Sequence, residues 1–138
     1  MTWYYNDKPV TEELIEGYTG FVYLITNTVT GKKYIGKKLF TSARTLKPLK
    51  GKSRKRRTRI PSDWMTYYGS NKDLCEDVKK HGGDQFKRVI LRLCSSKSEA
   101  NYHEAKYQFE MDAILRDDFY NGWIMIKVHR NRTLDKRS

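Results

Sequence analysis

Two short strand-like runs joined by a turn-rich link constrain the fold of this chain more than any other feature. Residues 21–25 (Phe-Val-Tyr-Leu-Ile) and 34–36 (Tyr-Ile-Gly) are rich in the aromatic and β-branched residues that suit a pleated sheet. The link over residues 26–31 carries Asn, Thr and Gly, which favour turns. We therefore expect an antiparallel hairpin in which Tyr23 and Tyr34 stand near each other on one face, if the register allows.

Positive charge is concentrated in one segment of a chain whose formal net charge is +12. Residues 44–59 contain nine basic side chains and no acidic one. Pro48 and Gly51 argue against a helix here, so we expect a mobile loop that becomes ordered on phosphate. A solvated loop or a localisation signal is the alternative, but a run this dense favours contact with nucleic acid. The residues expected to make that contact are Arg54, Lys55, Arg56, Arg57 and Arg59.

The length of 138 residues predicts a single domain over residues 1–138, with the basic segment as an insertion at about 44–61. Cys75 and Cys94 are far apart and in no metal-binding spacing, which predicts reduced thiols in a cytoplasmic protein. The sequence has no signal peptide and no apolar run long enough to cross a membrane. We therefore expect no membrane partner.

Signals for the remaining elements predict an α/β (α+β) fold, with a small three-stranded antiparallel sheet flanked by helices. Capping residues predict helices over residues 11–17, 71–80 and 96–115. Alternating apolar residues predict the third strand over residues 86–94. The chain begins with an aromatic tail, and its apolar run over residues 123–128 predicts a final strand or a docked segment.

A carboxylate lies within the apolar stripe of the longest expected helix. At roughly 100° per residue, Glu104 shares a helix face with Ala100, Tyr107 and Met111. An ionised carboxylate buried without a partner is costly, so Glu104 must be satisfied in some way. The carboxylate could form a salt bridge, or it could lie at a solvent-exposed edge of the apolar stripe. It could also bind a metal ion or take part in catalysis.

The order of several short motifs resembles that of the GIY-YIG nuclease superfamily. Gly20-Phe21-Val22-Tyr23 resembles the first motif with its glycine displaced by one position, and Tyr34-Ile35-Gly36 is the second motif. The further matches, in chain order, are Lys37, Arg44, Glu104 and Asn121. The resemblance covers roughly residues 20–123. The small size of the chain is most similar to that of stand-alone, phage-type members.

The resemblance implies a metal-dependent endonuclease that hydrolyses DNA phosphodiester bonds through an activated water. It implies Mg²⁺ or Mn²⁺ held by Glu104, and a phosphate clamp supplied by Arg44. Tyr34, or else Tyr23, would orient or deprotonate the water with the help of Lys37. A phenol with a pKa near ~10 is a poor base at neutral pH, so deprotonation would require a neighbouring cation to lower that pKa. The implied catalytic set is Tyr23, Tyr34, Lys37, Arg44, Glu104 and Asn121.

Other interpretations explain part of the pattern. A non-catalytic nucleic-acid-binding protein on the same fold would need the basic segment but not the carboxylate. An unrelated RNA-binding protein would explain the basic segment but not the spaced motifs. Tyr23 and Tyr34 also fit a purely structural role as cross-strand aromatics, and Asn121 fits a turn before Gly122. One such site cuts one strand, so a double-strand cut would need two nicks or a homo-oligomer.

Overall fold

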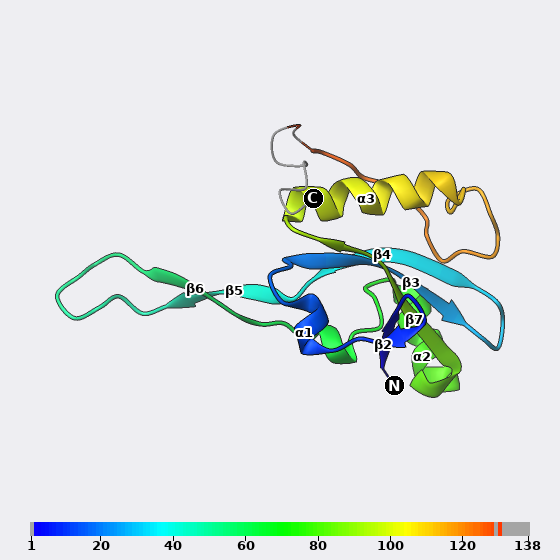
Figure 1. Ribbon diagram of the computed structural model, residues 1–138, viewed down its shortest axis with the longest axis horizontal. Coiled ribbons are helices and arrows are strands. Elements are labelled where there is room, and N and C mark those ends of the chain that lie inside the picture. Colours follow the sequence, from blue (N-terminus) through cyan, green and yellow to red (C-terminus); the bar gives the residue numbers. More distant parts are fainter. Residues whose placement is uncertain (1, 129, 131–138) are drawn as a thin grey trace.

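The computed structural model describes residues 2–128 and 130, apart from the side chains of residues 43–45 and 57. A five-stranded mixed sheet with the strand order β2-β1-β7-β3-β4 forms its centre (Figure 1). The strands of this sheet are β1 (Trp3–Tyr5), β2 (Lys8–Pro9), β3 (Gly20–Asn27), β4 (Lys33–Leu39) and β7 (Phe86–Cys94). The strands β5 (Thr41–Leu46) and β6 (Arg56–Pro61) form a separate two-stranded sheet. The helices are α1 (Glu12–Ile15), α2 (Lys72–His81) and α3 (Lys97–Glu110), with 3-10 turns η1 (Trp64–Thr66) and η2 (Gly83–Gln85).

The three predicted strands form the antiparallel middle of the sheet as β4, β3 and β7. The register places Tyr23 opposite Gly36 and Ile25 opposite Tyr34. Because residues two apart on a strand share a face, the two tyrosines lie on the same face. This confirms the expected hairpin.

The prediction of a three-stranded, wholly antiparallel sheet is wrong in its extent, because the aromatic N-terminal tail adds two strands. β1 pairs parallel to β7, and β2 folds back antiparallel to β1. Asn6 and Asp7 join them with positive φ angles of 51° and 64°, the conformation of a tight hairpin turn. Trp3 is 1% exposed, so its burial holds this segment against the sheet.

Helices lie on both sides of the sheet (Figure 1), and each face of the sheet packs into its own apolar core. On the face toward α1 and α2, Phe21, Tyr23 and Leu74 belong to a large aromatic cluster. On the face toward α3, Val22 and Ala100 belong to a smaller cluster. The strict alternation along β3 therefore sends neighbouring side chains into different cores.

The predicted helices are confirmed, but the last one is shorter than expected. Thr11, Asn71 and Ser96 each accept a hydrogen bond from a backbone N–H of the first helical turn. α3 ends at Glu110 rather than near residue 115. Asp112 has a φ of +51°, which turns the chain back toward the sheet without a glycine or proline to announce it.

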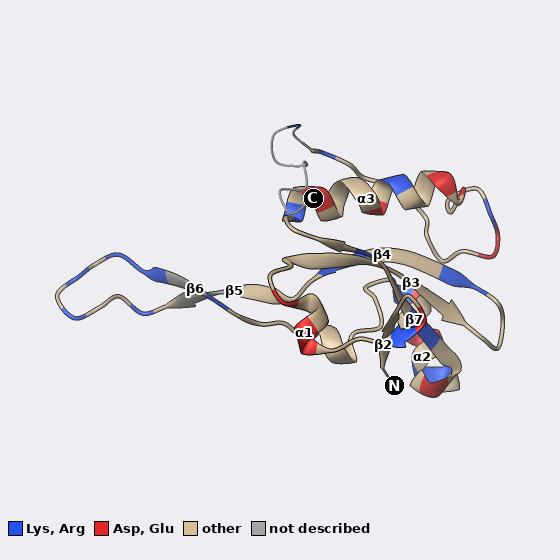
Figure 2. Cartoon of the chain, in the orientation of Figure 1, with Lys and Arg blue, Asp and Glu red and all other residues tan. Residues whose placement is uncertain are grey.

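The predicted basic loop is instead a β-hairpin, which corrects the sequence interpretation. The pairs from Thr41↔Pro61 to Leu46↔Arg56 make a regular antiparallel ribbon, and only residues 47–55 form the connection. We call residues 41–61 the basic hairpin. It projects away from the body of the protein, and the coloured charges along it are blue (Figure 2). Pro48 and Gly51 lie in the connection, where they do not interrupt the strand pairing.

Residues 123–128 form no strand but run as an extended segment near α3 (Figure 1). The side chains of Trp123 and Met125 are 70% and 72% exposed. Among the described residues, none of the helices is long and apolar enough to cross a membrane.

Candidate functional site

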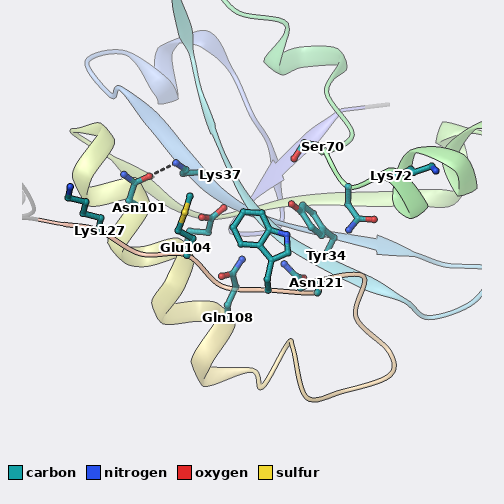
Figure 3. Close-up of a pocket in the computed structure, with 13 residues that line it drawn as sticks. Tyr34, Lys37, Ser70, Lys72, Asn101, Glu104, Gln108, Asn121 and Lys127 are labelled. Atoms are coloured by element: carbon teal, nitrogen blue, oxygen red, sulfur yellow. Dashed lines mark hydrogen bonds between the residues drawn. The ribbon is translucent and has the colours of Figure 1, made fainter.

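A cavity of about 600 Å³ lies at the open edge of β4, between α3, the start of α2 and the extended segment that follows Asn121 (Figure 3). β4 is the last strand of the sheet, and within the described residues its outer edge is bridged only at Lys33, to Phe119. Four of the predicted site residues line this cavity: Tyr34, Lys37, Glu104 and Asn121. The fold thus brings together residues from β4, α3 and the C-terminal segment.

The two tyrosines of the hairpin have different environments. Tyr34 lines the cavity, whereas Tyr23 is 1% exposed within the core beneath it. Their ring centroids are 6.2 Å apart. Burial raises the pKa of Tyr23 well above its ordinary value, and charge repulsion and a hydrogen bond with Tyr67 raise it further. Tyr34, and not Tyr23, is therefore the phenol that a ligand in the cavity would meet.

Tyr34 is a neutral phenol at neutral pH. Burial raises its pKa, and a hydrogen bond with the Ser70 hydroxyl opposes this shift without reversing it. The neighbouring groups whose charge shifts this pKa are Glu104, Tyr67 and Cys75, and all three raise it, so no cationic side chain among the described residues lowers the pKa of Tyr34.

Glu104 is half-buried and points into the cavity from α3 (Figure 3). Burial raises the pKa of its carboxyl group, while the charge of Lys37 and a backbone hydrogen bond from Lys37 lower it. Among the described residues no carboxylate other than Glu104 lines the cavity. Its carboxylate is a candidate ligand for a cation, because a positive charge would offset the cost of burial.

Lysines surround this carboxylate. Lys37 donates a short hydrogen bond from Nζ to Asn101 Oδ1, which holds the ammonium group beside α3. Lys72, at the start of α2, and Lys127, in the C-terminal segment, also line the cavity. With three lysines to one glutamate, the described lining carries net positive charge, which favours an anionic ligand such as a phosphate.

Asn121 fixes the edge of β4 rather than pointing a free amide into the cavity. Its Oδ1 accepts a hydrogen bond from the Ile35 N–H (3.0 Å), and its Nδ2 donates one to the Ile35 carbonyl (2.8 Å). The side chain is buried and replaces the strand that the sheet lacks here. Asn121 therefore does more than precede a turn, because it positions the strand that carries Tyr34 and Lys37, and its catalytic role stays a prediction.

Arg44 and the other predicted nucleic-acid contacts belong to the basic hairpin. The backbone of Arg44 lies in β5 opposite Thr58, while its side chain and that of Arg57 lie outside the described residues. The side chains of Arg54, Lys55 and Arg56 are exposed. The predicted residues therefore lie in two separate places, some at the cavity around Glu104 and the others on the projecting basic hairpin.

Several cavity residues were missed in the sequence. Gln108 lies one helical turn after Glu104 and donates a hydrogen bond from Nε2 to the Ile35 carbonyl (3.2 Å). Asn101 lies one turn before Glu104, so the i, i+3 and i, i+4 spacing around the carboxylate was a usable signal. Ser70 and Lys127 gave no such signal, because only the folding of the chain brings them to the cavity.

Comparison with known proteins identifies the family of the chain. A family model described as "Putative endonuclease segE, GIY-YIG domain" matches residues 3–124. Neither the curated proteins nor the solved structures give a significant match. The matched region contains β1 through α3 and every residue named above as lining the cavity except Lys127. The chain belongs to the GIY-YIG domain family represented by segE.

Proposed function

We propose that this protein is a metal-dependent endonuclease that hydrolyses DNA phosphodiester bonds by attack of an activated water. The observation that carries the proposal is the convergence of Tyr34, Lys37 and Glu104 on one positively charged cavity. Membership of a family named for an endonuclease supports hydrolytic activity. The surrounding lysines support a phosphodiester as the substrate.

The donors around Glu104 fit a hydrated divalent cation. Mg²⁺ keeps several of its waters and is often held by only one or two protein carboxylates. The described part of the chain contains no group of three His, Cys, Asp or Glu side chains of the kind that holds zinc. Glu104 would hold Mg²⁺ or Mn²⁺, and the bound ion would supply positive charge to stabilise the phosphate as negative charge develops on it.

In this proposal Tyr34 orients the attacking water as a neutral phenol. Its phenol lines the cavity, and orienting a water through a hydrogen bond does not require the phenol to lose its proton. Tyr23 supports the Tyr34 ring from the core. Asn121 and Gln108 hold the edge of β4 from which Tyr34 and Lys37 project.

The cations have a separate task, which is to bind the phosphate. Lys37, Lys72 and Lys127 line the cavity from three elements, so a phosphate there would be approached from several sides. As the family resemblance implies, the guanidinium group of Arg44 would donate further hydrogen bonds to the phosphate. Charge-assisted hydrogen bonds of this kind position the scissile group before the reaction begins.

Plasmid nicking tests the proposal. The wild-type protein should nick supercoiled DNA with Mg²⁺ or Mn²⁺ and stop when EDTA is added. Glu104→Gln should lower the rate by about 10²–10³-fold while leaving DNA binding in place. Glu110→Gln, on an exposed position of the same helix, is the matched control and should cut normally.

Two results would overturn the proposal. Wild-type protein that binds DNA tightly but leaves it intact under all metal conditions would identify a non-catalytic binding protein. Cutting by Glu104→Gln at the wild-type rate would remove Glu104 from the reaction.

A further inference from the structure

We propose that the basic hairpin enters the major groove of duplex DNA. The inference deepens the proposed function and rests on it only for the position of the cut relative to the hairpin.

The shape of the basic hairpin fits this groove. It is a ribbon of two antiparallel strands with six residues each, which corresponds to about 20 Å of strand at about 3.3 Å per residue. It projects beyond the body of the protein, so its connection is free to approach a ligand (Figure 1). The major groove of B-DNA is about 12 Å wide and about 8.5 Å deep and admits such a ribbon, whereas the minor groove, about 6 Å wide, does not.

The same dimensions argue against double-stranded RNA. The major groove of A-form RNA is deep and narrow, and protein side chains do not read it. A two-stranded ribbon therefore has a groove of suitable width in DNA but not in RNA. A single strand offers no groove at all.

The chemistry of the basic hairpin also suits the groove. Its residues 44–59 carry nine basic side chains and no acidic one, so the phosphates on both sides of the groove would be neutralised (Figure 2). Leu49, in the connection, is an apolar side chain that is 53% exposed within this charged segment. Apolar side chains of this kind can contact the methyl group of thymine in the major groove.

A second cavity lies at the base of the hairpin, beside the site around Glu104. It has a volume of about 460 Å³, and the cations that line it are Lys37, Lys38, Arg59 and Lys97. Arg59 donates hydrogen bonds to the Thr41 carbonyl (2.7 Å) and to Thr41 Oγ1 (2.6 Å), which fixes it at the base of the hairpin. Lys38 is paired with Asp63 (2.7 Å), whereas Lys97 is exposed at the start of α3.

Lys37 lines both cavities, so the two lie next to each other along a path from the base of the hairpin toward Glu104. A DNA backbone that follows this path would place the groove contact on one side of the cut. The structure therefore predicts an asymmetric footprint, with the hairpin protecting the duplex to one side of the scissile bond.

Binding interference tests the inference without cleavage. The full chain carrying Glu104→Gln is mixed, in EDTA, with labelled duplex DNA that has been partly methylated at guanine N7, an atom in the major groove. The matched variant also has residues 47–55 replaced by Asn-Gly, a two-residue turn that closes the ribbon directly after the Leu46↔Arg56 pair. Because β5 and β6 form a separate sheet, an unchanged melting temperature of the body is the folding control.

We expect N7 methylation within one stretch of the duplex to weaken binding by about tenfold, and the shortened variant to lose that sensitivity. A matched RNA duplex and single-stranded DNA should compete at least about tenfold more weakly than duplex DNA. If a minor-groove ligand displaces the protein from the duplex while N7 methylation has no effect on binding, the inference is wrong. It is also wrong if the protein binds the RNA duplex as tightly as duplex DNA. Major-groove interference by a wild-type protein that never cuts would instead refute the proposed function and leave this inference intact.

Discussion

The hydroxyl group of Tyr23 lies over Gly36 of the neighbouring strand, in the space that a side chain at position 36 would occupy. An ideal Cβ atom there would be 2.6 Å from Tyr23 Cζ and 2.9 Å from Tyr34 Cε2. The absence of a side chain at Gly36 thus lets the two phenol rings meet beside the cavity. This gives the glycine of the second motif a packing role.

Gly36→Ala should lower the free energy of unfolding by about 1–3 kcal/mol, because the added methyl group overpacks the Tyr23 ring. Urea denaturation measures this change. Gly122→Ala is the control, since a Cβ there meets no atom within 4 Å. Equal stability of the two variants would contradict the packing role.

Removal of single hydroxyl groups should separate the roles of the two tyrosines. Tyr34→Phe should lower the kcat for nicking by about 10²-fold, because this hydroxyl lines the cavity and would orient the water. Tyr23→Phe should instead cost about 1 kcal/mol of stability through the lost hydrogen bond with Tyr67, with little change in kcat. A larger loss of kcat in Tyr23→Phe would reverse the assignment.

Asn121→Ala should lower the free energy of unfolding by about 1–3 kcal/mol, because it leaves the buried N–H of Ile35 without its acceptor. Gln108→Ala should cost less, since the Ile35 carbonyl would keep its bond from Asn121. Thermal or urea unfolding of both variants checks the order. Loss of nicking by Asn121→Ala at unchanged stability would show that Asn121 acts on the substrate directly.

Stability should fall at alkaline pH because of the buried phenols. The pKa of Tyr23 is raised above the value near ~10 of an unfolded tyrosine, so above that pH the unfolded chain loses a proton that the folded protein keeps. The stabilising contribution is complete below the unfolded pKa and decreases by about 1.4 kcal/mol per pH unit as the pH rises above it. Denaturation at several pH values measures this slope. In Tyr23→Phe the free energy of unfolding should fall less steeply with pH, by the amount that corresponds to one proton. An equal slope in the variant and the wild type would contradict the prediction.

Neutralising Arg54, Lys55, Arg56 and Arg57 should weaken DNA binding and reduce the slope of log K against log salt by up to about four. The control changes four exposed lysines outside the basic hairpin and the cavity, Lys8, Lys79, Lys80 and Lys87. Equilibrium binding at several salt concentrations provides the measurement. If both sets of changes flatten the slope equally, the hairpin has no special part in binding.

The sequence was sufficient to predict the elements whose signals are local. The β3–β4 hairpin, the span of β7 and the caps of the three helices follow from alternation, turn residues and capping residues over a few positions. Local signals did not predict the elements that depend on contacts between residues far apart in the sequence. The N-terminal tail forms strands because Trp3 is buried beside β7. The chain leaves α3 through the positive φ of Asp112, with no glycine or proline to predict this end of the helix. The basic segment pairs with itself although its composition predicts a loop.

The candidate site divides in the same way. From the sequence alone we predicted one set, because the types and order of its members suffice for the family resemblance: Tyr23, Tyr34, Lys37, Arg44, Glu104 and Asn121. Only the tertiary structure placed Tyr34 at the cavity and Tyr23 in the core, turned Asn121 toward the backbone of Ile35, and set the basic hairpin apart from Glu104. The physical reason is that residue type and spacing show which chemical roles are possible. The burial of a side chain and its hydrogen-bond partners depend on segments that come into contact only when the chain is folded.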